Sequence, residues 1–322
     1  MDEHLPPPSE QVALTLEEGG GVEEQIVAVD PPLRAALELI ERAAVRRGGV
    51  LIMGPTGVGK DLLARRVHRC SGRAGAFVAV NCAAFNEGLV ESSLFGHVRG
   101  AFTGAVASVP GALLEAHRGT LFLDELGELS APVQAKLLRA IEGGFVRPLG
   151  AARSSPVDLR IVAATNRDLR REVDAGRFRA DLYFRLATFI VDVPPLRERP
   201  GDIAALVAKL AGEHDRARDV RLSAAAVRAL TAYRWPGNVR ELRNVIERVL
   251  SLAPEGQIGI DVLRRLAPEL LEPATAPPDG TLASTVQHRM LDRLHRGGTR
   301  QQVAEDLGIH RSTLWRRLKQ QR

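Results

Sequence analysis

The chain has 322 residues, 45% of them hydrophobic and 26% charged, and a net charge of +5. This length and composition fit two or three folded units, and no apolar run reaches the roughly 18 residues of a membrane-spanning helix. Two cysteines, Cys70 and Cys82, exclude a disulfide framework, and without a CxxC motif or paired histidines they disfavour a zinc site. We therefore expect a cytoplasmic protein with no membrane contact.

The charge is unevenly distributed along the chain. Residues 1–30 carry eight acidic side chains and no Lys or Arg, whereas residues 281–322 carry nine Lys or Arg and three Asp or Glu. Residues 1–25 lack hydrophobic periodicity and begin with the acidic, proline-rich "MDEHLPPPSE", which predicts a flexible acidic arm rather than a secretory signal. The basic C-terminal end indicates a nucleic-acid partner; a solvated charged surface is the alternative.

Five short β-rich runs alternate with helical patterns between residues 26 and 195. They are "GGVLIMG", "AFVAVN", "GTLFLDE", "LRIVAATN" and "FIVDVP". Strands separated by helices predict an α/β subdomain with a parallel sheet. After the proline-rich break "PPLRERPGD" only helical patterns follow, which predicts a helical lid at 196–270. The composition of "EPATAPPDGT" predicts a linker at 271–280, and residues 281–322 are predicted to form a separate helical unit.

A phosphate-binding loop is predicted at "GPTGVGKD", between the apolar run "VLIM" and the helical pattern "LLARRVHR". Its glycines let backbone N–H groups turn toward phosphate oxygens, and the lysine and the helix N-terminus add positive charge. The predicted nucleotide-binding residues are Gly54, Pro55, Thr56, Gly57, Val58, Gly59, Lys60 and Asp61. The alternative is a glycine turn followed by an exposed lysine. Asp61 occupies the position where a Ser or Thr usually binds Mg²⁺, so the metal must depend more on water, phosphate and a second acidic site.

That acidic site follows in "GTLFLDELGEL", where a buried strand is expected to end in Asp124 and Glu125. We predict that Asp124 holds Mg²⁺ and that Glu125 orients or deprotonates the attacking water; the alternative is a solvated acidic pair. The next strand pattern, "IVAATN", ends in Thr165 and Asn166, polar residues suited to sensing the γ-phosphate.

The segment "GHVRGAFTGAVASVPGALLEA", residues 96–116, contains four glycines around Phe102. The glycines offer almost no side chain for the Phe102 ring to pack against within the loop. The ring therefore either packs in the core of the protein or contacts another molecule.

Taken in order, these motifs resemble those of an AAA+ ATPase, and more narrowly the central domain of the sigma-54-dependent transcriptional activators, also called bacterial enhancer-binding proteins. The resemblance extends from about Ile26 to Ala253. It includes "VNCAAF", "ESSLFGHVRGAFTGA", "QAKLLRAIE", "FRADLYFRL" and "WPGNVRELRNVIER". Pro55, Asp61 and Val98 depart from the family pattern, and we expect them to alter affinity or rate without abolishing function.

The resemblance implies roles for individual residues and the cofactors ATP and Mg²⁺. Asn81 would hold Glu125 until the γ-phosphate binds, and Arg240 would read the nucleotide state from the lid. Arg179 and Arg185 would act as arginine fingers on the neighbouring subunit's nucleotide, with surface ion pairing as the alternative. The sigma-factor and promoter contact on the face of a hexameric ring would be Gly100, Ala101, Phe102, Thr103, Gly104 and Ala105.

The last segment, "GTRQQVAEDLGIHRSTLWRRLKQQR", has the pattern of a helix–turn–helix and resembles the Fis-type domain that ends this activator family. Arg311, Ser312 and Thr313, near the start of the second helix, are predicted to read bases. Arg316, Arg317 and Lys319 are predicted to contact phosphates. A helical hairpin used only for oligomerisation is the alternative. Two-fold DNA sites imply dimers, formed through "LASTVQHRMLDRLHR".

The leading hypothesis is an ATP-hydrolysing activator that binds upstream double-stranded DNA. It would assemble from inactive dimers into a ring and remodel closed complexes of sigma-54 RNA polymerase. The N-terminal arm is too short to form a sensory domain, so we expect control by a separate regulatory protein or by expression level. The rival is a DNA-binding regulator whose ATPase fold is only a nucleotide-dependent oligomerisation scaffold. A P-loop small-molecule kinase lacks an acceptor-binding motif here and would not explain the helix–turn–helix.

Overall fold

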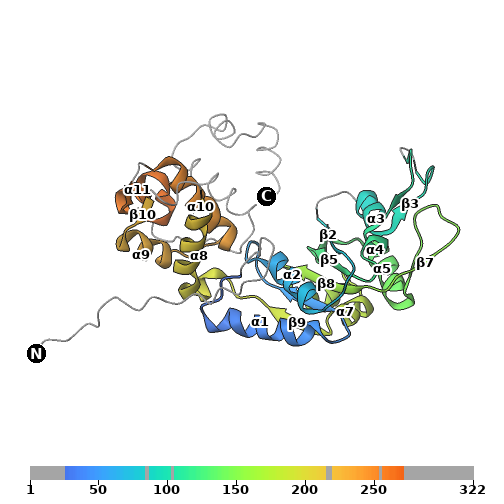
Figure 1. Ribbon diagram of the computed structural model, residues 1–322. Helices are drawn as coiled ribbons and strands as arrows, with labels where there is room; N and C mark the ends of the chain where they lie inside the picture. The colour runs from blue at the N-terminus through green and yellow to red at the C-terminus, as the bar shows by residue number, and fades with distance from the viewer. Residues whose placement is uncertain (1–25, 84–86, 103–104, 215–219, 254–255, 272–322) are drawn as a thin grey trace, which may run out of the picture.

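The computed structural model describes residues 26–83, 87–102, 105–214, 220–253 and 256–271. These residues form an α/β subdomain and a smaller, mainly helical subdomain, which occupy opposite ends of the view in Figure 1. The predicted acidic arm, residues 272–280 of the predicted linker and the predicted helix–turn–helix lie outside the described residues. None of the described helices is long and apolar enough to cross a membrane.

The α/β subdomain alternates strands and helices, as the sequence predicts. Its larger elements are α1 (Pro31–Ala44), β1 (Val50–Met53), α2 (Lys60–Cys70), β2 (Phe77–Asn81), α3 (Glu87–Phe95), β5 (Thr120–Asp124), α5 (Ala131–Gly143), β8 (Arg160–Thr165), α6 (Leu169–Asp174), α7 (Ala180–Leu186) and β9 (Phe189–Asp192). Its smaller elements are β3 (Gly96–His97), β4 (Val109–Pro110), α4 (Ala112–Glu115), the 3₁₀ turn η1 (Leu126–Glu128), β6 (Phe145–Val146) and β7 (Ser155–Pro156).

All five predicted strand runs enter one parallel sheet with the order β2-β5-β8-β1-β9. β1 lies between β8 and β9, with Met53 opposite Thr165 and Asp192. On the other side of β8, β5 pairs with β2, and Asn81 lies opposite Asp124. Because the strands are parallel, their carboxyl ends lie at one edge of the sheet, and the predicted polar residues lie at or directly after those ends. The predicted parallel α/β fold is confirmed.

Side chains alternate between two cores, one on each face of the sheet. Leu51, Leu123 and Ala163 pack into one buried cluster, whereas Ile52 and Phe122 belong to the cluster on the opposite face. Strands covered on both faces read as continuous apolar runs instead of alternating patterns, which explains the form of the five runs in the sequence.

The helical subdomain contains η2 (Leu196–Glu198), α8 (Pro200–Glu213), α9 (Ala224–Ala232), α10 (Asn238–Leu252), α11 (Ile260–Leu266) and η3 (Pro268–Leu270). Its core surrounds Trp235, which is buried and donates its indole N–H to the Leu230 carbonyl at 2.8 Å. The expectation of helices alone is corrected by a parallel pair, β10 (Val220–Leu222) and β11 (Gly256–Ile258). Three-residue strands that pair over a long chain separation are too short to produce a period-two pattern.

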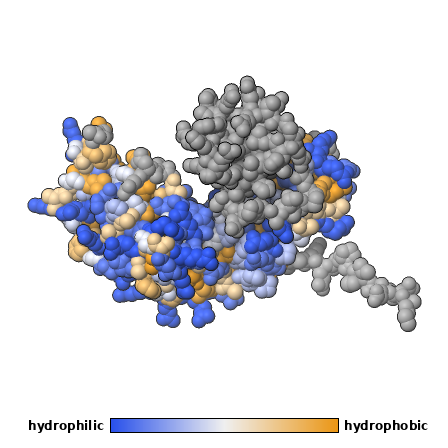
Figure 2. Space-filling model, turned by 180° about the vertical axis from the view of Figure 1, so that it is seen from behind, coloured by the Kyte–Doolittle hydropathy of each residue, from blue (hydrophilic) through white to orange (hydrophobic). Residues whose placement is uncertain are grey.

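Hydrophilic residues predominate over much of the face shown in Figure 2. Hydrophobic residues gather at the end that bears β3 and β4 in Figure 1, beside the grey atoms of uncertain placement. Exposed large hydrophobic side chains near this end include Phe102, Val106, Val109 and Phe145. A surface of this kind favours contact with another molecule.

Candidate functional site

The predicted phosphate loop leaves the carboxyl end of β1 and closes against the start of α2. The Gly54 N–H donates to the Thr165 carbonyl at 3.2 Å, which anchors the loop to β8. Gly59 has a φ of +95° and is the residue that precedes the first turn of α2. Lys60 is buried, and its Nζ donates to the carbonyls of Gly54 at 3.0 Å and Pro55 at 3.3 Å. The alternative of a turn with an exposed lysine therefore does not fit the structure.

Asp124 ends β5, and Glu125 follows it in a left-handed conformation with φ 51° and ψ 46°. An Asp124 carboxylate oxygen accepts the Glu125 N–H at 3.0 Å. A left-handed conformation in a residue other than glycine costs about 1–3 kcal/mol and is concentrated at functional sites. The turn directs the chain into η1 immediately after the two carboxylates.

Lys60 and Glu125 influence each other's protonation. Burial lowers the pKa of Lys60, and the charges of Glu125 and Asp124 oppose that effect. Burial raises the pKa of Glu125, and the Lys60 charge opposes that rise. An ammonium and a carboxylate with opposed pKa shifts at the carboxyl edge of a parallel sheet are typical of a catalytic site.

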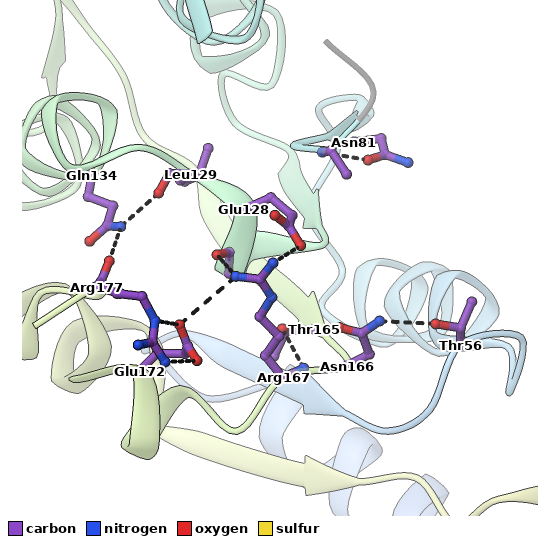
Figure 3. Close-up of polar contacts among 12 residues, drawn as sticks. Thr56, Asn81, Glu128, Leu129, Gln134, Thr165, Asn166, Arg167, Glu172 and Arg177 are labelled. Carbon is purple, nitrogen blue, oxygen red and sulfur yellow. Dashed lines mark hydrogen bonds and ion pairs between the residues drawn. The ribbon is translucent and has the colours of Figure 1, made fainter. Parts of the chain in front are cut away.

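Asn81 ends β2 opposite Asp124, and Cys82 follows it. The Asn81 Oδ1 accepts the Ala83 N–H at 2.8 Å (Figure 3), and the Cys82 N–H donates to the Asp124 carbonyl at 2.9 Å. The predicted contact between Asn81 and Glu125 stays a prediction. Burial raises the pKa of Cys82 to about 12, so its thiol stays protonated, and both cysteines pack with hydrophobic clusters.

The two predicted sensing residues after β8 have different surroundings. Asn166 points to the phosphate loop, and its Nδ2 donates to the Thr56 Oγ1 at 3.0 Å (Figure 3). Thr165 is fully buried, and its Oγ1 accepts the Arg167 N–H at 3.1 Å. Asn166 is therefore the residue of this pair whose side chain contacts the phosphate loop, whereas Thr165 contacts that loop through its carbonyl and shapes the following turn through its hydroxyl.

The lid contacts the phosphate loop directly at the start of α10. The Arg240 N–H donates to the Gly57 carbonyl at 3.3 Å, and the Arg240 charge also acts on Lys60. A Cβ added at Gly57, whose φ is +81°, would lie 2.4 Å from the Gly237 carbonyl oxygen and 3.1 Å from the Arg240 Cβ. The close approach of the lid therefore requires glycine at position 57.

Asn238 is a lid residue that sequence reasoning missed. Its Nδ2 donates to the Thr56 carbonyl at 3.0 Å, and its Oδ1 accepts the Leu196 N–H at 2.8 Å. It is buried and has a φ of +53°. The signal was present in "WPGNVREL", because an asparagine tolerates a left-handed conformation and sits two residues before Arg240.

A buried ion pair between Arg199 and Asp202, which was not predicted from the sequence, also contacts the phosphate loop. Arg199 and Asp202 are 2% and 0% exposed, and the Arg199 Nη1 lies 3.4 Å from the Asp202 Oδ2. The Arg199 Nη2 donates to the Val58 carbonyl at 3.1 Å. Asp202 Oδ1 accepts the N–H groups of Val29 at 2.6 Å and Asp30 at 2.8 Å. The pair thus joins the chain before α1 and the start of α8 to the phosphate loop.

The predicted arginine fingers lie around α7. The Arg179 guanidinium donates to Asp181 through Nε at 3.0 Å and Nη2 at 2.7 Å. Arg185 is exposed and forms no salt bridge with another described residue. Phe184, between them, is 74% exposed. Neither arginine forms a hydrogen bond with the phosphate loop among the described residues, so their predicted catalytic role requires a second subunit.

The predicted partner-contact segment lies in the loop that connects β3 and β4. Gly100 donates its N–H to the Ala105 carbonyl at 2.9 Å, and Ala105 donates to the Phe102 carbonyl at 3.0 Å. Phe102 is 42% exposed and lies against the His97 ring at a centroid distance of 5.0 Å. Phe102 therefore belongs to the surface rather than the core. Thr103 and Gly104 lie outside the described residues.

The chemistry of these residues fits a bound Mg²⁺–nucleotide. The backbone turn, Lys60 and the N-terminus of α2 suit phosphate oxygens, and Asp124 offers a carboxylate for the metal. Mg²⁺ usually binds one or two carboxylates together with phosphates and water. The described residues contain no group of three or more His, Cys, Asp or Glu side chains that could hold a metal ion.

The parallel sheet has the strand order β2-β5-β8-β1-β9, with a phosphate loop after β1, two carboxylates at the end of β5 and a lid arginine at the loop. These features define an AAA+ ATPase-type fold. Similarity to solved structures agrees. NtrX from Brucella abortus, in a complex with ATP, has a TM-score of 0.69 and 30% identity, covering 92% of this chain and 69% of that one. A RuvB variant from Thermotoga maritima has a TM-score of 0.54 at 19% identity, covering 88% of this chain and 82% of that one, and shows the fold alone.

Family models divide the chain in the same order. The sigma-54 interaction domain matches residues 26–192, the AAA+ ATPase lid domain matches residues 197–277, and the Fis family of bacterial regulatory proteins matches residues 294–320. The chain belongs to the family of sigma-54-dependent transcriptional activators.

Two curated relatives illustrate the similarity. The sigma54-dependent transcriptional activator SfnR of Pseudomonas putida is 43% identical over 293 residues, covering 90% of this chain and 78% of that protein. The Nif-specific regulatory protein of Azotobacter vinelandii is 45% identical over 261 residues, covering 80% of this chain and 50% of that protein. The chain therefore spans most of the first relative and half of the second.

The six predicted DNA-contacting residues, Arg311, Ser312, Thr313, Arg316, Arg317 and Lys319, lie outside the described residues. They fall within the segment that matches the Fis family model. A DNA-binding helix–turn–helix is thus supported, whereas the contacts of each residue stay a prediction.

Proposed function

We propose that this chain hydrolyses ATP in a homo-oligomeric ring and uses the energy to remodel sigma-54 RNA polymerase at promoters near its DNA site. The observation that carries the proposal is the convergence of Lys60, Glu125, Asn166 and Arg240 on one phosphate loop. In this proposal these residues, together with Asp124, perform the tasks of ATP hydrolysis that one subunit can supply, and a neighbouring subunit supplies further positive charge.

Each residue has a task that follows from its position. Lys60, held beneath the loop by two carbonyls, would exchange those acceptors for phosphate oxygens. Glu125, with a pKa raised by burial, would accept a proton from the attacking water. Asn166 and Arg240 would sense the γ-phosphate from the sheet and from the lid. Mg²⁺ held by Asp124 would neutralise charge on the phosphates.

Arg179 and Arg185 would supply the missing positive charge to the neighbouring subunit. An arginine finger contributes about 10³–10⁵ in rate, so hydrolysis should depend on assembly. Phe184, exposed between them, suits a subunit interface, where aromatic residues are enriched. We therefore propose a ring, formed from dimers that are inactive when alone.

The loop that carries Phe102 would contact the sigma factor. It lies at the end of the α/β subdomain remote from the lid (Figure 1), and its partly exposed aromatic ring offers apolar contact area. The helix–turn–helix would tether the assembly to double-stranded DNA. A separate regulatory protein could then act on assembly or on the nucleotide site.

The substitution Phe102→Ala separates this proposal from an oligomerisation scaffold that does not remodel polymerase. ATPase activity and DNA binding should be retained, while open-complex formation with sigma-54 polymerase should fail. Val45→Ala removes an apolar side chain that is 68% exposed at the end of α1 and is the matched control. Normal open-complex formation by Phe102→Ala, or no ATPase activity of the unmodified chain at any concentration that permits assembly, would overturn the proposal.

A further inference from the structure

Arg167 follows the sensing residue Asn166, but its side chain extends to a different element. Its Nη1 donates to the Gly127 carbonyl at 3.1 Å, and its Nη2 pairs with the Glu128 carboxylate (Figure 3). Gly127 and Glu128 belong to η1, the turn that begins directly after Glu125. Arg167 therefore connects the two loops that follow β5 and β8, and both loops border the nucleotide site.

Glu172 on α6 extends this connection away from the phosphate loop. It accepts two hydrogen bonds from the Arg177 guanidinium, both at 2.7 Å, and lies 3.9 Å from the Arg167 Nη1. Its side chain is 14% exposed, and the Arg177 hydrogen bonds hold its pKa below the ordinary value. An ionised Glu172 thus bridges Arg167 and Arg177 (Figure 3).

Gln134 on α5 forms a second connection, between the end of η1 and residues 177–179. Its Nε2 donates to the carbonyls of Leu129 at 2.8 Å and Arg177 at 3.1 Å, and its Oε1 accepts the Arg179 N–H at 2.8 Å. The side chain is 1% exposed, so breaking any of these bonds would leave a buried polar group unpaired. The position of η1 is therefore coupled to that of the segment that carries Arg179.

The segment 177–185 is packed into the hydrophobic core on one side. Phe178 and Leu182 are buried in the same hydrophobic cluster as Leu169, whereas Phe184 and Arg185 are exposed. A displacement of residues 177–179 would therefore move α7 as a unit and change the position of both predicted arginine fingers.

We propose that Arg167 and Glu172 are positioning residues that couple a subunit's own nucleotide site to the arginines it presents to the next subunit. The inference rests on the proposed trans-acting role of Arg179 and Arg185. Partly exposed ion pairs of this kind contribute roughly 0–1 kcal/mol to stability. Their loss should therefore change the geometry of the fingers much more than the stability of the fold.

The first experiment compares Arg167→Gln in the full chain with the unmodified chain and with Arg171→Gln. Arg171 lies on α6 next to Glu172, its side chain is 85% exposed, and the ion pair it forms is a local one with Asp168. Because a displacement of about 1 Å can cost 10²-fold in rate, we expect kcat for ATP to fall about 10- to 100-fold in Arg167→Gln. Affinity for ATP and thermal stability should be retained, and Arg171→Gln should be unaffected. An unchanged kcat in Arg167→Gln would overturn the proposal.

The second experiment mixes Arg167→Gln subunits with Glu125→Gln subunits, which lack the proposed base but keep their arginines. In a mixed ring, the Glu125→Gln neighbour offers well-placed arginines to the intact site of Arg167→Gln. ATPase activity should therefore return on mixing. If it does not return, the defect lies in the subunit's own site and the coupling is refuted. Glu172→Gln should behave in the same way and replaces Arg167→Gln if that variant does not fold.

A reference mixture of Arg179→Ala with Glu125→Gln separates two kinds of failure. If the reference regains activity and the Arg167→Gln mixture does not, the coupling alone is wrong. If the reference also stays inactive, Arg179 does not act on a neighbour, and the proposed function fails together with the coupling.

Discussion

The buried pair of Arg199 and Asp202 makes the sharpest stability prediction. Asp202→Ala removes the acceptor of two backbone N–H groups, those of Val29 and Asp30, and leaves a guanidinium that is 2% exposed without its partner. Arg199 would still donate to the Val58 carbonyl, but it would carry an unpaired charge. Removal of one member of a buried pair typically costs 3–5 kcal/mol, and we expect a loss of about 4 kcal/mol in the free energy of unfolding.

The double variant Arg199→Met with Asp202→Asn tests where this loss originates. Burial raises the pKa of Asp202 and lowers that of Arg199, so desolvation opposes both charges. The double variant removes both charges and keeps an amide oxygen for the two N–H groups. It should therefore lose less stability than Asp202→Ala, even though it carries two substitutions.

Urea and thermal unfolding measure the effect. A loss of about 4 kcal/mol corresponds to a decrease in Tm of roughly 8–16 °C for 150–250 folded residues. Arg197→Ala is the control, since its side chain is 56% exposed and pairs with Glu198 beside it; its effect should stay within about 0.5 kcal/mol. A loss of less than about 1 kcal/mol in Asp202→Ala, the range of a surface ion pair, would refute the reasoning.

Two further predictions concern the nucleotide site. Gly57→Ala should weaken ATP binding, because its Cβ would lie 2.4 Å from the Gly237 carbonyl oxygen. Gly72→Ala controls for backbone strain, since Gly72 has a φ of +66° but no atom within 4 Å of an added Cβ. Equal affinities for ATP in the two variants would contradict the prediction. Burial raises the Glu125 pKa above the ordinary 4.5. The rate of ATP hydrolysis should therefore fall as pH drops through that raised value, and stability should fall as pH rises through it. Glu125→Gln should unfold at a higher temperature than the unmodified chain near pH 8, with the gap closing toward pH 4.5; a constant gap would argue against a buried, ionising Glu125.

The sequence was most informative where the chemistry is local. The eight residues of "GPTGVGKD" include both the glycines that a phosphate-binding turn needs and the lysine that supplies its charge. The apolar runs that precede Asp124 and Asn166 predict strands that place these polar residues at one edge of the sheet. Parallel pairing then requires those residues to meet. For this reason the phosphate loop, the acidic pair and the fold class could all be predicted without coordinates.

Residues that act through distant partners could not be predicted in this way. Gln134 looks like an ordinary polar residue in a helical pattern, yet it is buried and joins Leu129, Arg177 and Arg179. Asp202 lies in the proline-rich break, and its partners Val29 and Asp30 come about 170 positions earlier. Nothing local distinguishes these side chains, because their hydrogen-bond partners are brought together only by packing.

The amino-acid sequence by itself therefore determined the class of the protein, the order of its main elements and the position of the phosphate loop and the acidic pair at the ends of their strands. The tertiary structure alone decided how these parts are joined: Gly57 lies against the lid, Arg199 donates to the phosphate loop, and Arg167 joins η1 to Glu172 on α6. The physical reason is that backbone turns and strand patterns depend on neighbouring residues. Burial, close approach and shared ion pairs depend on contacts between segments that are far apart in the chain.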